Sequence, residues 1–374
     1  MKEVVITTPT VPRSFDSIKD LITTHTEIAI NTKLFSGCVI GIIRNDKEAI
    51  LPFGSYTYES GATQMHENSV FDVASITKSV PTSSLALWLI SQGRLKLDDP
   101  LKKFIPEFEG TYSDDVIIQH LLTFTMELNI SLDILNLNPY SIVGDDILEK
   151  VLKAGLAEKP GSNFQYRNTT SILLGIVIER ITGKKLDVLA EEIFFRPLSM
   201  NKTMFDPLAR IPRSEIVSTE ICAWRDKLIQ GEVHDEMTSL FGGKAVGSSG
   251  LFSTVPDLLR FAKMIMSRGS FNAGNFFSQR ILETFKENYL KDIGREYTLG
   301  WDKLSWGYIG CPCFCRTAIV ITGFTGCSMM VDIRKCIAII ILSNAIHPKR
   351  DPGSMYEFRR TIADIMVYCK HCYE

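Results

Sequence analysis

Ser75-Ile-Thr-Lys78 places a hydroxyl and an amine three residues apart, directly after the mainly apolar stretch Phe71-Asp-Val-Ala74. In a helix that begins at Ser75, residues three apart share a face, so the amine lies one turn from the hydroxyl. A serine hydroxyl is a weak nucleophile at neutral pH and needs a base beside it. The stretch therefore predicts a nucleophile and its base, and the Ser75 amide at a helix start can stabilise an oxyanion.

The same spacing occurs a second time, at Ser199-Met-Asn-Lys202, so the pattern alone is weak evidence. Serine is also a common N-cap residue, and a lysine on a helix is usually solvated. From spacing alone, a capping serine followed by a solvated lysine is the stronger interpretation of Ser75 and Lys78.

Two later stretches carry side chains suited to the same chemistry. Tyr166-Arg-Asn168 precedes residues 169–181, whose apolar positions recur at a helical period. A tyrosine near cations can act as a base, and an amide can bind a substrate carbonyl. Thr322-Gly-Phe-Thr-Gly326 ends an apolar run, and its glycines let a substrate lie against a strand edge. Each stretch also has a simpler interpretation, because Asn168 suits an N-cap and the glycines suit a hairpin turn.

The three stretches, in this order, resemble the serine β-lactamase-like superfamily, and Tyr166 indicates its branch of class C β-lactamases, penicillin-binding proteins, D,D-peptidases and esterases. Flanking segments extend the resemblance over residues 35–344, among them Pro160-Gly-Ser-Asn-Phe-Gln-Tyr166 and Ser249-Gly-Leu-Phe-Ser-Thr254. Ser199 falls in a Pro-Leu-Ser-Met segment that is structural in such proteins. The resemblance implies an α/β (α+β) fold, in which an antiparallel β-sheet flanked by helices carries an inserted mainly α-helical domain.

By the same resemblance, Ser75 would be the acylated nucleophile, and Lys78 would take or relay its proton. Tyr166 would act as general base in acylation and in activating water. Asn168 would hold Lys78 and the substrate amide, and the backbone amides of Ser75 and Phe324 would form the oxyanion hole. The residues expected to bind substrate are Asn168, Thr322, Gly323 and Phe324.

Ile321 departs from the family pattern, because relatives have Lys or His directly before Thr-Gly. A cation at that position draws in a substrate carboxylate and favours the ionised form of the tyrosine. Its absence has two interpretations: the substrate lacks that carboxylate, as a neutral ester or amide does, or catalysis is weakened or lost. Arg316, Lys244 and Arg167 are candidate replacements for the missing cation.

Strand patterns lie at both ends of the chain and helical patterns in the middle. We expect strands at 37–44, 48–56, 317–322, 327–333 and 336–343, and terminal helices at 15–30 and 354–368. A helix from Ser75 to Ser91 contains Pro81, which should kink it, and further helices are expected at 114–122, 145–154, 169–181, 185–194, 256–266 and 278–289. The chain is expected to be one domain, 1–374, with residues 1–74 and 295–374 forming a sheet lobe and 75–294 a mainly helical lobe.

The composition argues against several classes of protein. Of the 374 residues, 45% are hydrophobic and 22% charged, with a net charge of −2, so a soluble protein with a large core is expected. No basic block suggests nucleic acid. Residues 1–9 lack the apolar core of a signal peptide, and the apolar run 337–342 is too short to span a bilayer. We therefore expect a cytoplasmic protein with a small-molecule substrate and no cofactor, and the oligomeric state is left open.

Nine cysteines, an odd number without a signal sequence, indicate reduced thiols. Four of them have apolar or mixed neighbours and are expected to be small core residues: Cys38, Cys222, Cys327 and Cys336. The clusters Cys311-Pro-Cys-Phe-Cys315 and Cys369-Lys-His-Cys372 do not have the spacing of a standard zinc site. The zinc ligands that they could supply are Cys313, Cys315, Cys369 and Cys372, although thiols without metal are the preferred interpretation.

The sequence as a whole predicts a serine hydrolase that forms an acyl-enzyme on Ser75 and cleaves an ester or small amide. One alternative is a D,D-peptidase or β-lactamase that acts on wall peptides or β-lactams. The other is a catalytically weakened or inactive binding protein that keeps the cleft. Ile321 favours the binding protein, whereas the intact Ser75, Lys78 and Tyr166 favour an enzyme.

Overall fold

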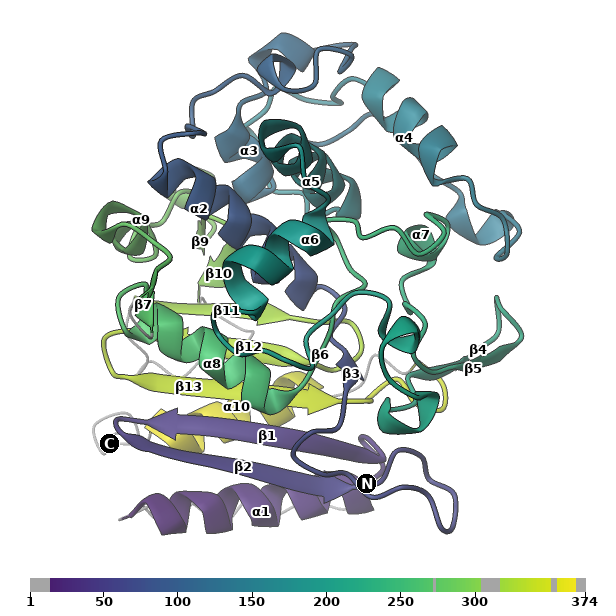
Figure 1. The fold of residues 1–374 in the computed structure, drawn as a ribbon, viewed down its shortest axis with the longest axis vertical. Helices are drawn as coiled ribbons and strands as arrows, with labels where there is room; N and C mark the ends of the chain where they lie inside the picture. The colour runs from purple at the N-terminus through teal and green to yellow at the C-terminus, as the bar shows by residue number, and fades with distance from the viewer. Residues whose placement is uncertain (1–13, 272–273, 304–316, 351–354, 368–374) are drawn as a thin grey trace.

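One antiparallel sheet combines strands from both ends of the chain. The computed structural model describes residues 14–271, 274–303, 317–350 and 355–367, and within them seven strands pair in the order β2-β1-β13-β12-β11-β10-β9 (Figure 1). The strands are β1 (Gly37–Arg44), β2 (Lys47–Gly54), β9 (Tyr297–Thr298), β10 (Trp301–Lys303), β11 (Ala318–Thr322), β12 (Ser328–Asp332) and β13 (Ile337–Ser343). The N-terminal hairpin thus lies beside the last strand, as the expected fold requires.

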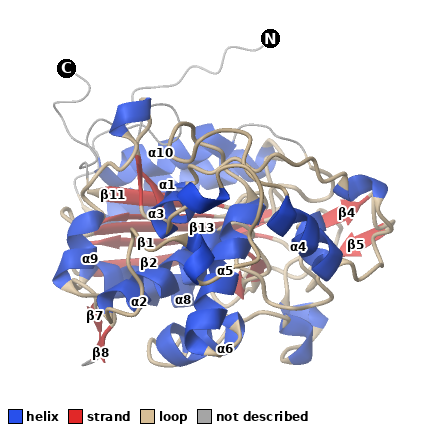
Figure 2. Cartoon of the chain, turned by 90° about the horizontal axis from the view of Figure 1, so that it is seen from above, coloured by secondary structure: helices blue, strands red, loops and turns tan. Residues whose placement is uncertain are grey.

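Alternating side chains along β1 separate the two faces of the sheet. Cys38, Ile40 and Ile42 belong to the apolar cluster beneath α1 (Phe15–Asn31) and α10 (Met355–Val367). Val39 and Ile43 belong to the larger cluster on the opposite face. Because successive side chains of a strand point to opposite faces, one strand supplies both layers, and Figure 2 shows α1 and α10 on the same side of the sheet.

The helix α8 (Val255–Met266) packs directly on the second face of the sheet. Thr254 caps it by accepting a hydrogen bond from Asp257 N. Gly41 makes the close approach possible, because a Cβ at that position would lie 2.4 Å from a methyl carbon of Val255 and 2.9 Å from one of Leu259. The helix therefore belongs to the sheet layer, although it lies in the chain segment that we assigned to the helical lobe.

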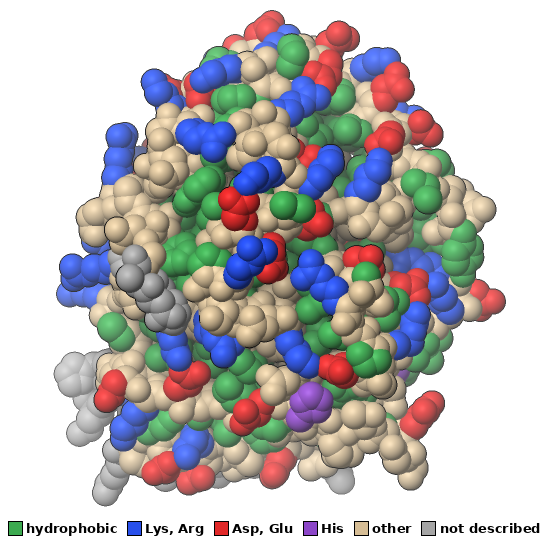
Figure 3. Space-filling model, in the orientation of Figure 1, with side chains coloured by type: hydrophobic (Ala, Val, Ile, Leu, Met, Phe, Trp, Pro, Cys, Tyr) green, Lys and Arg blue, Asp and Glu red, His purple; other side chains and the backbone are tan. Residues whose placement is uncertain are grey.

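The helical part of the molecule lies above this layer in Figure 1. Its helices are α2 (Ser84–Ser91), α3 (Ile118–Thr123), α4 (Gly144–Lys153), α5 (Asn168–Thr182), α6 (Leu186–Ala190), α7 (Glu236–Ser239) and α9 (Gln279–Thr284). Three short two-stranded ribbons lie outside the main sheet in the described part of the chain. They pair β3 (Phe71–Asp72) with β6 (Phe252–Ser253), β4 (Glu220–Cys222) with β5 (Lys227–Ile229), and β7 (Ser270–Phe271) with β8 (Gly274–Asn275). On the face shown in Figure 3, basic and acidic side chains are interspersed.

Several expected helices differ from the structure. The helix expected at 114–122 begins only at Ile118, and the α-helical part of the one expected at 185–194 ends at Ala190. The helix expected from Ser75 to Ser91 is interrupted: residues Lys78–Ser83 form a wide π-helical segment with non-helical angles at Val80, directly before Pro81. The expected kink at this proline is therefore confirmed. The helix expected at 278–289 ends earlier, since α9 stops at Thr284.

The cysteine predictions are only partly met. Cys38, Cys222 and Cys327 are buried thiols, but Cys336 is exposed in the turn before β13, so its assignment to the core is wrong. The four candidate zinc ligands lie outside the described residues. Within the part of the chain that the structure describes, no group of three or more potential metal ligands forms, and no helix is long and apolar enough to cross a membrane.

Candidate active site

A strained turn presents Ser75. The chain turns at Ala74, whose φ of +48° lies in the left-handed region, which is uncommon for a residue with a side chain. Asp72 holds the turn, because its Oδ1 accepts a hydrogen bond of 2.8 Å from the Ala74 amide. After the turn, the Lys78 amide donates to the Ser75 carbonyl at 3.0 Å and the helical segment begins. The expected position of Ser75, at a helix start after an apolar approach, is therefore present.

The Lys78 amine is buried beside the Ser75 hydroxyl. The residue is 1% exposed, and its Nζ lies 2.9 Å from Ser75 Oγ and 2.9 Å from the Ser248 carbonyl. Burial lowers the pKa of Lys78 to about 8, and the Asp235 carboxylate opposes that effect. A neutral amine is thus available at mildly alkaline pH to accept the Ser75 proton. The solvated-lysine interpretation is excluded by this burial.

Tyr166 lies against the same amine, whereas Asn168 has a different partner. Lys78 Nζ is 5.1 Å from the centroid of the Tyr166 ring, and that ring packs 4.8 Å from Phe124. Asn168 begins α5 and donates from Nδ2 to Asp235 Oδ2 at 2.8 Å. Lys78 Nζ bonds to Ser75 Oγ and the Ser248 carbonyl, so the expected hold of Asn168 on Lys78 is not present as a direct hydrogen bond between these two described residues. The binding of substrate by Asn168 stays a prediction.

The end of β11 lies directly against the nucleophile turn. A Cβ on Gly323 would be 2.5 Å from the Val73 carbonyl oxygen and 3.4 Å from Ala74 Cβ, so only glycine allows this approach. Thr325 Oγ1 also donates to the Asp72 carbonyl at 2.9 Å. Among the described residues, neither the Ser75 amide nor the Phe324 amide has a hydrogen-bond acceptor. An oxyanion hole requires two backbone N–H donors that are available to the substrate beside the nucleophilic serine.

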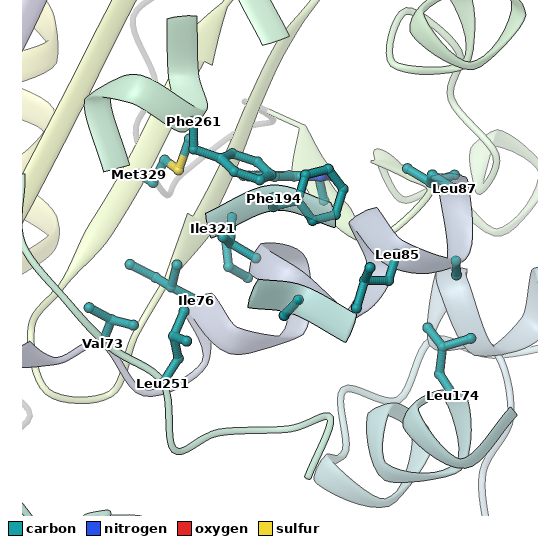
Figure 4. Packing of buried hydrophobic residues seen from close by; sticks show 14 of the residues in the cluster. Val73, Ile76, Leu85, Leu87, Leu174, Phe194, Leu251, Phe261, Ile321 and Met329 are labelled. Carbon is teal, nitrogen blue, oxygen red and sulfur yellow. The ribbon is translucent and has the colours of Figure 1, made fainter. Parts of the chain in front are cut away.

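Ile321 forms an apolar part of the cavity wall at the position where the family pattern leads us to expect a cation. The side chain is 4% exposed and belongs to the large apolar cluster. Figure 4 draws it within the same cluster as Val73 and Ile76 of the nucleophile segment and Phe261 of α8. The cluster continues from the sheet to the residues around Ser75. The side chain at position 321 is therefore part of the apolar core and carries no charge.

A cavity of about 790 Å³ opens in front of Ser75. The candidate residues that line it are Ser75, Tyr166, Ile321, Thr322, Gly323 and Phe324. Much of the remaining wall is apolar or aromatic, with Phe164, Tyr297, Val320, Ile346 and Met355 among its residues. Such a mainly apolar hollow with a few polar groups is typical of a small-molecule site.

Of the candidate replacements for the missing cation, the two that the structure describes, Lys244 and Arg167, do not line this cavity. Arg316 lies outside the described residues, and Lys244 pairs with Asp145 at 3.1 Å on the surface. Arg167 is exposed. The arginines that do line the cavity are Arg295, Arg350 and Arg359. Sequence spacing gave no signal for them, because they come from separate segments late in the chain.

Asp72 joins the segments of the site and was not predicted. Its Oδ1 accepts from Ala74 N, its Oδ2 accepts from His234 N at 2.8 Å, and its carbonyl accepts from Thr325. The side chain is buried, and burial raises its pKa although both backbone hydrogen bonds oppose this. The Asp72 carboxylate thus links the nucleophile turn to the loop before α7. The backbone carbonyl of Asp72 links the same turn to Thr325, just after β11. A charged residue in an apolar stretch, three residues before Ser75, was the only feature of the sequence that could have indicated this role for Asp72.

The second Ser-x-x-Lys copy has a different setting. Lys202 Nζ pairs with Glu215 at 2.6 Å, and its backbone amide donates to Asp257. The lysine is therefore engaged with carboxylates on a half-exposed surface, unlike the buried Lys78.

Known proteins resemble this chain in sequence. The Beta-lactamase family model matches residues 23–364. An Escherichia coli (strain K12) protein named for D-alanyl-D-alanine carboxypeptidase is 28% identical over 311 residues, which cover 76% of this chain and 71% of the relative. An N-acetylmuramyl-L-alanine amidase of Bacillus subtilis (strain 168) is 25% identical over 353 residues, which cover 85% and 79%.

Solved structures share the fold over nearly the whole chain. EstCE1, a hydrolase with promiscuous acyltransferase activity, superposes with a TM-score of 0.76 at 18% identity and covers 94% of this chain and 99% of its own. The D-alanine carboxypeptidase AmpC from Burkholderia cenocepacia has a TM-score of 0.70 at 19% identity, with coverage of 95% and 99%. At these identities the likeness concerns the fold.

Proposed function

Because the chain belongs to the beta-lactamase family and is a serine hydrolase of that type, we propose that it cleaves a neutral ester or small amide through an acyl-enzyme on Ser75. The observation that carries the proposal is the buried Lys78 amine, 2.9 Å from Ser75 Oγ. That contact gives the serine the adjacent base that nucleophilic catalysis needs.

In the proposed reaction, Lys78 Nζ accepts the proton as Ser75 Oγ attacks the substrate carbonyl. The carbonyl oxygen becomes negatively charged and is stabilised by the amides of Ser75 and Phe324. The proton then passes to the leaving alcohol or amine, and the acyl group stays on Ser75. In deacylation, Tyr166, against the Lys78 amine, is the base that takes a proton from the attacking water. A proton returns to Ser75 Oγ as the ester bond to the serine breaks, which releases the acid and restores the serine.

The preference for a neutral substrate rests on Ile321. A carboxylate placed against this buried apolar side chain would lose its hydration without gaining a cation as partner. An uncharged acyl or alcohol group, in contrast, would bury apolar surface there, worth roughly 25 cal/mol per Å². The apolar and aromatic lining of the cavity supports the same preference.

A second candidate is cleavage of an amide in a wall peptide. The names of the curated relatives, a carboxypeptidase and an amidase, favour it, and the cavity is large enough for part of a peptide. The absence of a cation at position 321 makes a terminal carboxylate a poor ligand at that point.

A fluorescent alkyl fluorophosphonate tests the nucleophile. We expect it to label the wild-type protein and the Ser199→Ala control, and not the Ser75→Ala variant. Label that persists in Ser75→Ala would show that another residue is the nucleophile. An unlabelled wild type, where a known family member labels, would favour a binding protein.

A substrate panel tests the reaction. We expect p-nitrophenyl butyrate to be hydrolysed faster than nitrocefin or a D-alanyl anilide. A faster reaction with the anilide would support the peptide candidate, and a faster reaction with nitrocefin would identify a β-lactamase.

A further inference from the structure

Phe324, whose backbone amide is the second proposed oxyanion donor, has an exposed side chain that is nevertheless held in place. Its side chain is 58% exposed, yet the ring stacks on His234 at 5.7 Å between centroids, with an interplanar angle of 20°. The guanidinium carbon of Arg350 lies 5.5 Å from the ring centroid. An exposed aromatic ring is thus held by two groups from distant parts of the chain.

His234 is itself held on both sides. Its Nε2 lies 2.7 Å from Glu220 Oε2, and both side chains are nearly fully buried. Its backbone amide donates to Asp72 Oδ2, the residue that also holds the nucleophile turn. The imidazole plane under Phe324 therefore has little freedom to rotate.

Arg350 is held by two carboxylates. Its Nε and Nη2 donate to the two oxygens of Glu220 at 2.7 Å each, and Nη2 also donates to Glu236 Oε1 at 2.8 Å. Such a forked pair fixes the plane of the guanidinium. Burial would raise the pKa of Glu220, but the hydrogen bonds from Arg350 and His234 lower it to about 2, so Glu220 is ionised throughout the physiological range.

The two carboxylates of this cluster outnumber its one guanidinium. Two carboxylates face one guanidinium and one imidazole, so the cluster is a poor receptor for a substrate anion even though Arg350 lines the cavity. It connects β4 to the segment after β13 and so contributes to stability. Its contact with the Phe324 ring, however, places it directly beneath the site, at the residue where an oxyanion donor is expected.

We propose that His234 and Arg350 are positioning residues, which hold the Phe324 ring and thereby aim its backbone amide at the oxyanion. Glu220 and Glu236 keep the two groups in place. The inference rests on the proposed function, because it assigns these residues to the oxyanion hole of that reaction. No group of the cluster exchanges a proton or a bond with the substrate.

The test compares Arg350→Met and Phe324→Leu with the control Arg180→Met, which removes an arginine that pairs with Glu107 and does not line the cavity. We expect the first two variants to lower kcat for p-nitrophenyl butyrate about 10- to 100-fold, less than the roughly 100- to 1,000-fold loss on complete removal of an oxyanion donor, with KM within about threefold. The rate of phosphonylation at Ser75 should fall by a similar factor, because that reaction also uses the hole. The double variant should lose no more than the worse single variant.

Three results would overturn the inference: unchanged kcat in folded Arg350→Met, an equal loss in Arg180→Met, or additive losses in the double variant. Phosphonylation of wild-type Ser75 is the separate test of the proposed function. The amide signal of Phe324 in a ¹⁵N-labelled sample keeps the positioning role testable if that reaction fails. The signal should shift in Arg350→Met and stay in place in Arg180→Met, and an unchanged signal in both would contradict the role.

Discussion

At the scale of single residues, Lys78 determines how the proposed reaction depends on pH. Only the neutral amine can take the Ser75 proton, and burial lowers the pKa of Lys78 to about 8. We therefore expect kcat/KM for p-nitrophenyl butyrate to rise about tenfold from pH 6 to pH 7, to reach half its maximum near pH 8, and to level off above pH 9. Initial rates in buffers of constant ionic strength measure this profile.

The Lys78→Met variant is the control for this profile, because it keeps the length of the side chain and removes the base. Its residual activity should lack the rise near pH 8. A wild-type profile that is flat from pH 6 to pH 9 would show that Lys78 is not the titrating base.

We expect Ile321 to influence which substrates the cavity accepts. In Ile321→Lys, an added amine would face the cavity and provide the missing partner for a carboxylate, so kcat/KM for carboxylate-bearing substrates should rise several-fold. The amine would also enter the large apolar cluster to which Ile321 belongs, and the free energy of unfolding should fall by about 1–3 kcal/mol. Rates on a matched pair of substrates, with and without the carboxylate, measure the change in preference.

Ile321→Met is the matched variant, since it has a long side chain without charge. It should leave both the preference and the stability close to wild type. An unchanged or lower rate of Ile321→Lys on carboxylate-bearing substrates would remove the role assigned to this position.

At the scale of elements, the contact between β11 and the nucleophile turn aligns the two proposed oxyanion donors. Gly323→Ala would place a Cβ 2.5 Å from the Val73 carbonyl, and backbone on both sides would have to move. We expect kcat/KM to fall at least tenfold and the free energy of unfolding to fall by about 1–3 kcal/mol. Kinetics and thermal unfolding of the same sample measure both.

Gly93→Ala is the control for Gly323→Ala. Gly93 has a positive φ of +68° but nothing within 4 Å of an added Cβ, so it should lose about 1 kcal/mol of stability and keep its activity. If Gly323→Ala keeps wild-type kcat/KM, the close approach of β11 does not set the geometry of the site.

The elements that could be predicted from sequence are those with an unbroken pattern. The strand expected at 37–44 coincides with β1, and the apolar run that contains Ile337 predicts β13, because long runs of branched apolar residues favour buried strands. The strands β9 and β10 were not predicted, since two or three residues are too few to show a period. The π-helical segment after Ser75 has no sequence pattern beyond Pro81.

The candidate site was predicted in part for a similar reason. Short motifs contain Ser75, Lys78 and Tyr166. In the structure, the Lys78 amine lies beside both the Ser75 hydroxyl and the Tyr166 ring. The partner of Asn168 and the contact of His234 with Asp72 join segments more than 60 residues apart in the chain, and the cavity arginines come from separate segments. Spacing along the chain contains no information on such contacts, so only the fold reveals them.

At the scale of the whole molecule, the helical part and the sheet share one apolar core. The large cluster includes Leu174 of α5, Phe261 of α8 and Ile321 of β11 (Figure 4). We therefore propose that the two expected lobes form one folding unit, because neither could bury its own share of this cluster alone. The site lies within that unit, and a change at Lys78 must alter the stability of the whole protein.

Lys78 thus links catalysis to global stability. Each pKa unit corresponds to about 1.4 kcal/mol, so a pKa lowered from 10.5 to about 8 destabilises the folded state by roughly 3 kcal/mol when the amine is charged. This cost is fully present below about pH 8 and disappears as the pH rises from 8 to 10.5. Lys78→Met removes it but leaves the Ser248 carbonyl without its donor, which costs about 1–2 kcal/mol.

We therefore expect Lys78→Met to be more stable than wild type by about 1–2 kcal/mol at pH 6.5, and this advantage to shrink or reverse at pH 9.5. Urea unfolding at both pH values measures the difference. Lys202→Met is the control, because its amine is half-exposed and paired with Glu215, so its removal should be neutral or slightly destabilising. A Lys78→Met variant that is less stable than wild type at both pH values would mean that the hydrogen bonds of the amine outweigh the cost of burying it.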